Sequence, residues 1–142
     1  MKPPIVPVSA VLLEKDGKFL VLKRLSGGHL PFLWEFPGGK RSANETWLRC
    51  ARRELLEETD LRAKSLRKVA IRIFNYSERT VEIHFFHCRE FSGELNTKQE
   101  FKWLRPNEMN PEDFPEASRD VIEQLKQGRL FGRSGPNSRN YA

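Results

Sequence analysis

The sequence predicts a domain of the α+β class, in which a mixed β-sheet lies between helices. Several short apolar runs are rich in β-branched residues, as strands are, and two longer segments repeat apolar residues at helical spacing. A length of 142 residues, 38% of them hydrophobic, suits one compact domain. We place that domain at residues 1–128 and expect residues 129–142, rich in Gly, Ser, Asn and Arg, to form a flexible basic tail.

The first elements form a predicted β-hairpin. Residues Val6–Leu13 are apolar and β-branched, Lys15–Lys18 contains an Asp-Gly turn, and Phe19–Leu22 resumes the apolar pattern. The aromatic-rich segment Leu30–Phe36 follows and ends at a Pro-Gly-Gly triplet. This break predicts a loop from Gly38 to Asn44.

The strongest helical pattern covers Glu45–Thr59. Four apolar residues recur there at three- and four-residue spacing and predict the buried stripe of an amphipathic helix. They are Trp47, Leu48, Ala51 and Leu55. Asn44 or Ser42 can cap the start of this helix, because both side chains accept hydrogen bonds from free backbone amides.

The second half of the chain predicts more strands and one further helix. The strands are expected at Val69–Phe74, Val81–Phe86 with Cys88, and Phe101–Leu104, with turns near Tyr76–Arg79 and Ser92–Gly93. The helix is expected over Glu116–Gln127, with Val121, Ile122 and Leu125 facing inward and Gly128 as its stop signal.

Composition narrows the class of partner. The 25 Lys and Arg residues outnumber 19 Asp and Glu, and a net charge of +6 favours phosphate-bearing partners, from nucleotides to nucleic acid.

We expect a cytoplasmic protein without a membrane span, because no apolar run approaches roughly 20 residues and no export pattern begins the chain. Cys50 and Cys88 lack a zinc-binding spacing and are expected to be reduced packing residues.

Three acidic residues gather on one face of the first predicted helix. Glu54, Glu57 and Glu58 stand at i, i+3 and i+4, where like charges repel each other. A divalent cation bound between them would offset this cost, and hard oxygen ligands indicate Mg²⁺ or Mn²⁺. The alternative is a solvated charged face with Arg52 and Arg53 as partners.

The residues around these acids form a fixed array. Gly39 is followed after five residues by Glu45 and after seven more by Arg53-Glu54-Leu55, then by Glu57-Glu58 and by Asp60-Leu61. This array resembles the Nudix box, G-x5-E-x7-R-E-U-x-E-E-x-G-U, where U is a bulky aliphatic residue. It departs only at the late Gly, which is Asp60 here. Asp tolerates the left-handed conformation that follows a helix, at a cost of about 1 kcal/mol.

The resemblance implies the Nudix fold and a loop-helix-loop that holds Mg²⁺, with Mn²⁺ as an alternative, against a diphosphate. The implied metal ligands are Gly38, through its carbonyl, with Glu54, Glu57 and Glu58. The implied catalytic residues are Glu54, Glu57 and Arg53, with Glu54 acting as a ligand or as the general base. Arg53 would brace the motif through an ion pair with Glu45.

A wider resemblance, from Val6 to Leu125, points to the MutT-type members, which hydrolyse nucleoside triphosphates to a monophosphate and pyrophosphate. Trp34–Lys40 and Glu112–Ala117 carry it. The implied substrate-binding residues are Arg24, His29, Glu35, Phe36, Arg79 and Ser118. Each also has an ordinary reading as a surface charge, a loop residue or a core residue.

Two departures from the MutT-type pattern bear on the substrate and the metal. Ser118 stands where enzymes for oxidised guanine have Asn, so the base preference stays open. A further carboxylate could come from Glu100 or Glu94. The expected partner is a small nucleotide, and the protein is expected to be a monomer or a homodimer.

Two other functions compete with this one. Removal of pyrophosphate from the 5′ end of RNA would use the same chemistry, assisted by the positive charge and the basic tail. A non-catalytic nucleotide-binding module is the alternative from another class. The presence of both Glu57 and Glu58 disfavours it, because degenerate relatives usually lose the paired glutamates.

Overall fold

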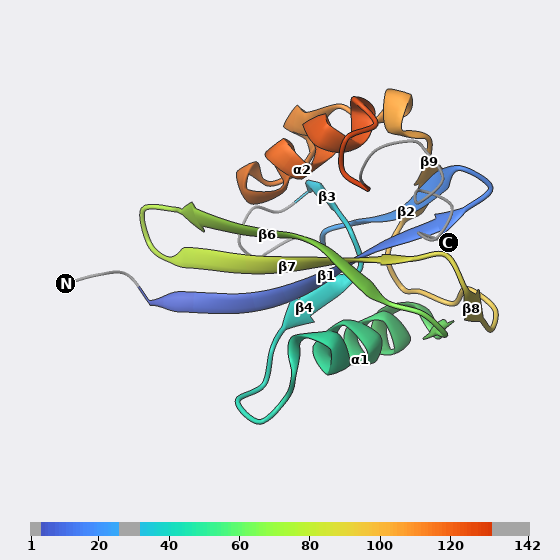
Figure 1. Ribbon diagram of the computed structural model, residues 1–142, viewed down its shortest axis with the longest axis horizontal. Helices are drawn as coiled ribbons and strands as arrows, with labels where there is room; N and C mark the ends of the chain where they lie inside the picture. The colour runs from blue at the N-terminus through green and yellow to red at the C-terminus, as the bar shows by residue number, and fades with distance from the viewer. Residues whose placement is uncertain (1–3, 26–31, 132–142) are drawn as a thin grey trace.

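The computed structural model describes residues 4–25 and 32–131 (Figure 1). The strands are β1 (Ile5–Lys15), β2 (Lys18–Lys23), β3 (Trp34–Glu35), β4 (Gly38–Lys40), β5 (Arg62–Ala63), β6 (Arg67–Asn75), β7 (Thr80–Cys88), β8 (Phe91–Ser92) and β9 (Phe101–Leu104). The helices are α1 (Trp47–Thr59) and α2 (Glu116–Lys126), with 3-10 turns at Pro106–Glu108 and Pro111–Asp113. In the part of the chain that the structure describes, no helix is both long and apolar enough to cross a membrane.

One mixed sheet organises the fold. Its strands run in the order β3-β2-β1-β7-β6, with β4 paired to β1 and β9 paired to β2. Strand β1 pairs in parallel with β7 from Ile5 opposite Thr80 to Leu13 opposite Cys88, and all its other pairings are antiparallel. Strands β5 and β8 form a separate two-stranded ribbon.

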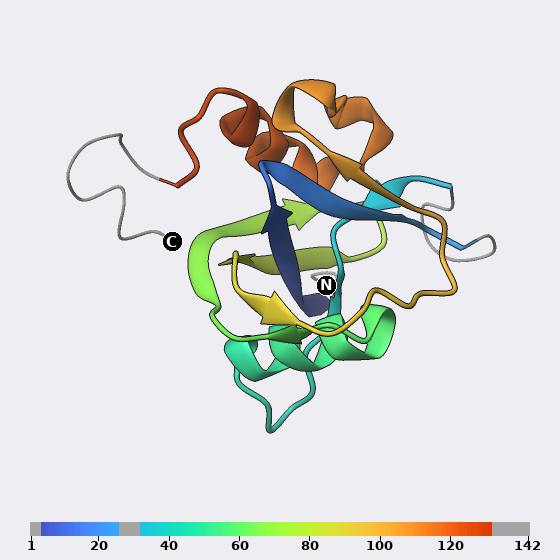
Figure 2. The ribbon, with the colours of Figure 1, turned by 90° about the vertical axis from the view of Figure 1, so that its right-hand side faces the viewer.

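The two helices cover opposite faces of this sheet (Figures 1 and 2). Side chains of β1 alternate between the faces, so that Leu12 belongs to the core beneath α2 and Leu13 to the core beneath α1. Leu55 of α1 and Val121 of α2 are fully buried in these two cores. Burial of each such side chain contributes roughly 1.5–3 kcal/mol. The predicted α+β architecture, a mixed sheet between helices, is confirmed.

The start of α1 differs from the prediction. The helix begins at Trp47, and its N-cap is Thr46, whose hydroxyl accepts a hydrogen bond from the amide of Arg49 at 3.1 Å. The predicted caps, Ser42 and Asn44, lie in the preceding loop. The buried stripe also differs, because Leu48 is 37% exposed while Cys50 is fully buried.

The predicted loop from Gly38 to Asn44 begins with a short strand. Residues Gly38–Lys40 form β4, in which Gly39 lies opposite Ser9 of β1. The Pro-Gly-Gly triplet therefore does not end the sheet. It carries a strand so close to β1 that a Cβ atom on Gly38 would lie 2.2 Å from the carbonyl oxygen of Ser9.

The chain also stays packed past the predicted domain boundary at residue 128. Leu130 is buried in the core beneath α2, and the ring of Phe131 stacks on His87 with a centroid distance of 3.9 Å. The ordered domain thus includes residues 129–131. The rest of the predicted tail, residues 132–142, lies outside the described residues.

Candidate active site

Arg53 connects several residues of the array into one network. Its Nε and Nη2 atoms donate to both carboxylate oxygens of Glu45, at 2.5 and 2.8 Å. Its Nη1 atom donates to Glu54 at 3.1 Å and to Glu57 at 3.0 Å. Hydrogen bonds from Arg53 lower the pKa of Glu45 to about 2. The structure therefore brings Arg53 and Glu45 together in the expected ion pair and links both to β4, since Nη2 also donates to the Lys40 carbonyl at 3.1 Å.

Of the three acids Glu54, Glu57 and Glu58, the fold partly withdraws Glu54 and Glu58 from water. A carboxylate oxygen of Glu58 accepts a hydrogen bond from the amide of Gly38 at 2.8 Å. Burial raises the pKa of Glu58 to about 8, and it raises the pKa of Glu54 to about 7. Repulsion from neighbouring carboxylates acts in the same direction at both residues.

The bare backbone of β4 gives the Glu54 carboxylate its place. A Cβ atom on Gly39 would lie only 1.6 Å from one carboxylate oxygen of Glu54. The absence of a side chain at this position therefore lets a charged group of α1 reach the strand. Gly39 and Gly38 both border the carboxylates on one side and a pocket on the other.

The donor set fits a divalent cation but is not assembled into a complete metal centre. Glu54 and Glu58 offer oxygen ligands whose negative charge burial destabilises, and a hard cation would relieve this. Glu57, with a side chain 56% exposed, forms an ion pair with Arg53, as Glu54 does. Across residues 4–25 and 32–131, no three acidic, thiol or imidazole side chains are grouped as ligands. Gly38 contacts Glu58 through its backbone amide, and the role of its carbonyl as a metal ligand stays a prediction.

The pocket beside β4 has a volume of about 360 Å³ and lies between the sheet and the start of α2. Five of the six predicted substrate-binding residues line it: Arg24, Glu35, Phe36, Arg79 and Ser118. The sixth, His29, lies outside the described residues. Segments from both halves of the chain thus converge on one cavity, with the two arginines supplying positive charge.

Glu35 is the partly buried acid of this pocket. It forms an ion pair with Arg24 at 2.8 Å, and the side-chain amide of Gln99 lies 3.5 Å from its other oxygen. Burial nevertheless raises the pKa of Glu35. The two candidates for a further carboxylate do not join the pocket: Glu100 is largely exposed and lies 3.9 Å from Lys23, and Glu94 is exposed.

Two residues near the site, Tyr76 and Gln99, are not among the site residues predicted from the sequence. Tyr76 lines the pocket, and its hydroxyl accepts a hydrogen bond from the amide of Ala117 at 3.0 Å, which ties the β6–β7 turn to α2. The segment around Tyr76 has the composition of a turn, and only the aromatic residue at its start hints at a buried role. Gln99 lies in an irregular segment that carries no periodic signal.

Comparison with known proteins identifies the family. The profile of the NUDIX domain matches residues 8–124 of the chain. The chain therefore belongs to the Nudix family and is a hydrolase, as the sequence array predicts. Asp60, the one departure from the array, adopts the expected left-handed conformation at the end of α1, with φ 64°.

Relatives and solved structures agree with this assignment. The chain is 29% identical to an 8-oxo-dGTP diphosphatase of Buchnera aphidicola, over 84% of this chain and 92% of that protein. It is 32% identical to a CTP pyrophosphohydrolase of Escherichia coli, over 78% of this chain and 87% of that protein. The solution structure of the E. coli ORF135 protein superposes with a TM-score of 0.75 at 28% identity, covering 89% of this chain and 94% of that one.

A more distant structure shows the fold alone. The MutT protein of Methanosarcina mazei superposes with a TM-score of 0.79 at 21% identity, covering 90% of this chain and 97% of that one. These similarities confirm the predicted Nudix fold over almost the whole chain.

Proposed function

We propose that this protein hydrolyses a nucleoside triphosphate to a nucleoside monophosphate and pyrophosphate with the help of Mg²⁺, for which Mn²⁺ can substitute. One observation carries the proposal: the partly buried carboxylates of Glu54 and Glu58 lie at Gly38 and Gly39, which also line the arginine-containing pocket. Relatives named as an 8-oxo-dGTP diphosphatase and a CTP pyrophosphohydrolase support a nucleotide substrate.

The residues of the site divide into metal-binding and substrate-binding groups. Glu54 and Glu58 would hold the cation, and Glu57 would join them after release from Arg53. A bound Mg²⁺ neutralises phosphate charge and lowers the pKa of a coordinated water. Arg24 and Arg79 of the pocket would offset the remaining phosphate charge.

Proton transfer from the attacking water needs a carboxylate that is a base near neutral pH. The pKa of Glu54, raised to about 7 by burial, matches this requirement in the protein without metal. Bound cation would favour the ionised form, so Glu54 would act as a ligand or as the base, as the family pattern implies. Arg53 would position Glu54 and Glu57 through its Nη1 contacts.

Recognition of the base falls to the apolar end of the pocket. Phe36 lines the cavity and stacks on Phe114 with a centroid distance of 5.6 Å. Ser118, at the start of α2, offers one hydroxyl in place of an amide that could make two hydrogen bonds to a base. We therefore propose a substrate choice that is not confined to oxidised guanine.

One panel assay tests the proposal. Pyrophosphate release is measured with standard and oxidised nucleoside triphosphates, nucleotide sugars, dinucleoside polyphosphates and 5′-triphosphorylated RNA, each with Mg²⁺ and with EDTA. We expect Mg²⁺-dependent release from free triphosphates. Release from RNA alone would replace the proposal with the RNA alternative, and tight metal-independent nucleotide binding without turnover would replace it with a binding module.

We also propose a cytoplasmic location, where nucleoside triphosphates are abundant. Cys50 and Cys88 are both free and buried, which suits a reducing compartment.

A further inference from the structure

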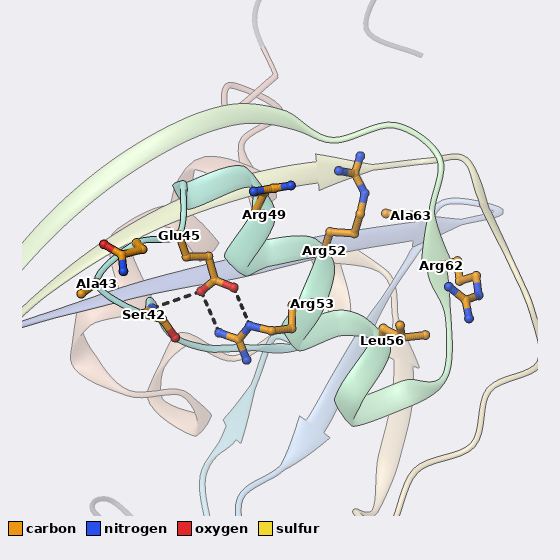
Figure 3. Close-up of a pocket in the computed structure, with 10 residues that line it drawn as sticks. Ser42, Ala43, Glu45, Arg49, Arg52, Arg53, Leu56, Arg62 and Ala63 are labelled. Atoms are coloured by element: carbon orange, nitrogen blue, oxygen red, sulfur yellow. Dashed lines mark hydrogen bonds and ion pairs between the residues drawn. The ribbon is translucent and has the colours of Figure 1, made fainter.

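A second, larger cavity lies on the outer side of α1 (Figure 3). We call it the α1 groove. Its volume is about 900 Å³, and it shares no lining residue with the pocket described above. The lining residues are Ser42, Ala43, Asn44, Glu45, Arg49, Arg52, Arg53, Leu56, Arg62 and Ala63.

The α1 groove is strongly positive. Four arginines line it against one glutamate, and that glutamate is neutralised by the paired contacts of Arg53. Arg49 and Arg52 project together from α1, while Arg62 belongs to β5 beyond the end of the helix (Figure 3). Within residues 4–25 and 32–131, no carboxylate forms an ion pair with Arg49, Arg52 or Arg62.

This arrangement is not required by the fold. Arg49, Arg52, Arg53 and Leu56 stand at i, i+3, i+4 and i+7, so the arginines crowd one face of α1. Other residues of the helix pack into the core, among them Ala51 and Leu55. Like charges at such spacing repel each other, and a bound anion would remove the repulsion.

The chemistry of the lining selects the kind of anion. Arginine forks match phosphate oxygens in paired hydrogen bonds. Among the described residues, no aromatic side chain lines the groove for a base to stack on, whereas sites for single-stranded nucleic acid use such platforms. We propose that the α1 groove binds an oligophosphate chain, free or carried by a nucleotide, through Arg49, Arg52 and Arg62.

The groove lies close to the catalytic array without being part of it. Arg53 forms one wall of the groove and also contacts Glu54 and Glu57. Its Nη2 atom donates to the carbonyl of Lys40, a residue that lines the pocket beside β4. The proposal does not depend on hydrolysis, because within the described residues Arg49, Arg52 and Arg62 form no ion pair with Glu54, Glu57 or Glu58 and do not line the pocket beside β4.

The test locates the anion on the protein in EDTA, where no divalent cation supports catalysis. Inorganic triphosphate is titrated into the ¹⁵N-labelled full-length chain, and the guanidinium Nε–Hε signals are followed by NMR. We expect saturable shifts of Arg49, Arg52 and Arg62 that weaken as salt is raised. The variant Arg49→Gln/Arg52→Gln should weaken this binding at least tenfold. Arg129→Gln, which removes an exposed arginine outside the groove, should leave it unchanged.

Further arms separate the sources of the phosphate chain and keep the test decisive. Adenosine tetraphosphate should give the same groove shifts as inorganic triphosphate if the chain itself is recognised. Shifts confined to Arg24 and Arg79 would overturn the proposal, as would no shift at any arginine. Equal binding of a 5′-hydroxyl oligonucleotide would assign the groove to nucleic acid instead. If the double variant unfolds by circular dichroism, Arg62→Gln alone must still weaken binding several-fold.

Discussion

Glu58 carries a carboxyl group that the fold withdraws from water and supplies with one hydrogen bond, from the amide of Gly38. The pKa of Glu58 is raised to about 8, from an ordinary value of 4.5. Below pH 4.5 the carboxyl is protonated in both the folded and the unfolded state. Between pH 4.5 and about 8 the folded state binds the extra proton, so its stability falls as pH rises.

We therefore predict a pH-dependent gain in stability for Glu58→Gln in the metal-free protein. The Tm of this variant should equal that of the wild type near pH 5 and exceed it by several degrees near pH 8.5, because the neutral amide needs no proton and its oxygen can still accept from Gly38. Comparison with the wild type at each pH cancels groups that do not interact with Glu58, including His84, whose pKa burial lowers. A constant difference across the range would contradict the assigned cause. Mg²⁺ should reverse the order at pH 8.5 by stabilising the wild type more than the variant, which lacks one of the proposed ligands.

Glu57 presents the opposite case, an acid that contributes little to stability. Its side chain is 56% exposed and forms an ion pair with Arg53 at 3.0 Å. An exposed ion pair of this kind contributes only about 0–1 kcal/mol. Glu57→Gln should therefore lower turnover at least about 100-fold while Tm stays close to that of the wild type.

The control for Glu57→Gln is Glu94→Gln, which removes an exposed acid outside the site and should change neither turnover nor Tm. Steady-state pyrophosphate release and thermal unfolding measure both quantities on the same samples. Unchanged turnover in Glu57→Gln would remove this residue from the catalytic array.

At the level of elements, β4 depends on two adjacent glycines for different reasons. A Cβ atom on Gly39 would meet the flexible end of the Glu54 side chain, which can move aside. A Cβ atom on Gly38 would meet backbone atoms of β1, at 2.2 Å from the oxygen of Ser9 and 2.9 Å from the Cα of Ala10. Backbone cannot move aside at similar cost.

This contrast predicts two different losses. Gly39→Ala should displace the Glu54 carboxylate and reduce turnover at least about tenfold, with a small change in Tm. Gly38→Ala should destabilise the domain by about 1–3 kcal/mol, because it overpacks a strand pairing. Urea unfolding and Mg²⁺-dependent turnover of both variants test the pair. A stability loss in Gly39→Ala as large as that in Gly38→Ala would show that Glu54 is not free to move.

The start of α1 supplies a prediction at the same scale. Thr46 caps the helix by accepting from the amide of Arg49, whereas Asn44 lies in the loop. Thr46→Ala should cost about 1 kcal/mol of unfolding free energy, and Asn44→Ala should cost less than about 0.5 kcal/mol. Denaturant unfolding of the two variants decides which residue is the cap.

Elements with a strong period could be predicted from the sequence, and those defined by long-range contact could not. The alternation in β1 and the spacing in α2 each match a single structure. Ser42, Asn44 and Thr46 are all good caps, so the choice depends on where β4 and the Glu45–Arg53 pair fix the loop. Glycines are poor strand formers, so the sequence did not predict β4. Its pairing with β1, in which Gly39 lies opposite Ser9, is visible only in the folded chain.

The same distinction applies to the candidate site. The grouping of the acidic residues could be predicted from the sequence, because the helical period places them on one face. Its electrostatics could not, since the raised pKa of Glu58 depends on burial and on neighbouring acids such as Glu35. Tyr76 and Gln99 reach the pocket region from segments without a repeating pattern, so only the folded chain shows them there.

On the scale of the whole molecule, the two cavities show where part of the basic charge of the chain gathers. The net charge of +6 indicates a phosphate-bearing partner but does not locate it. In the structure, arginines line a pocket beside β4 and a separate groove on the outer side of α1. Both cavities adjoin the Arg53 network, one through the Lys40 backbone and the other through Arg53 itself.

The C-terminal segment has two parts that truncation should distinguish. Leu130 is buried beneath α2 and Phe131 stacks on His87 and on Phe19, so these two residues belong to the core. Removal of residues 129–142 should cost roughly 2–4 kcal/mol through lost apolar burial and lower the Tm. Removal of residues 132–142 alone should leave Tm and the hydrolysis of free nucleoside triphosphates unchanged, because every described residue of the pocket and the acidic array remains.

These two truncations also decide whether the basic tail assists an RNA substrate. The shorter truncation is the informative one, since it removes tail charge without removing Leu130 and Phe131. If the free nucleotide is the substrate, its kcat/KM should be the same with and without residues 132–142 at every salt concentration. A truncation that lowers activity on 5′-triphosphorylated RNA at low salt, while activity on free nucleotides holds, would show that the tail recruits nucleic acid through its charge.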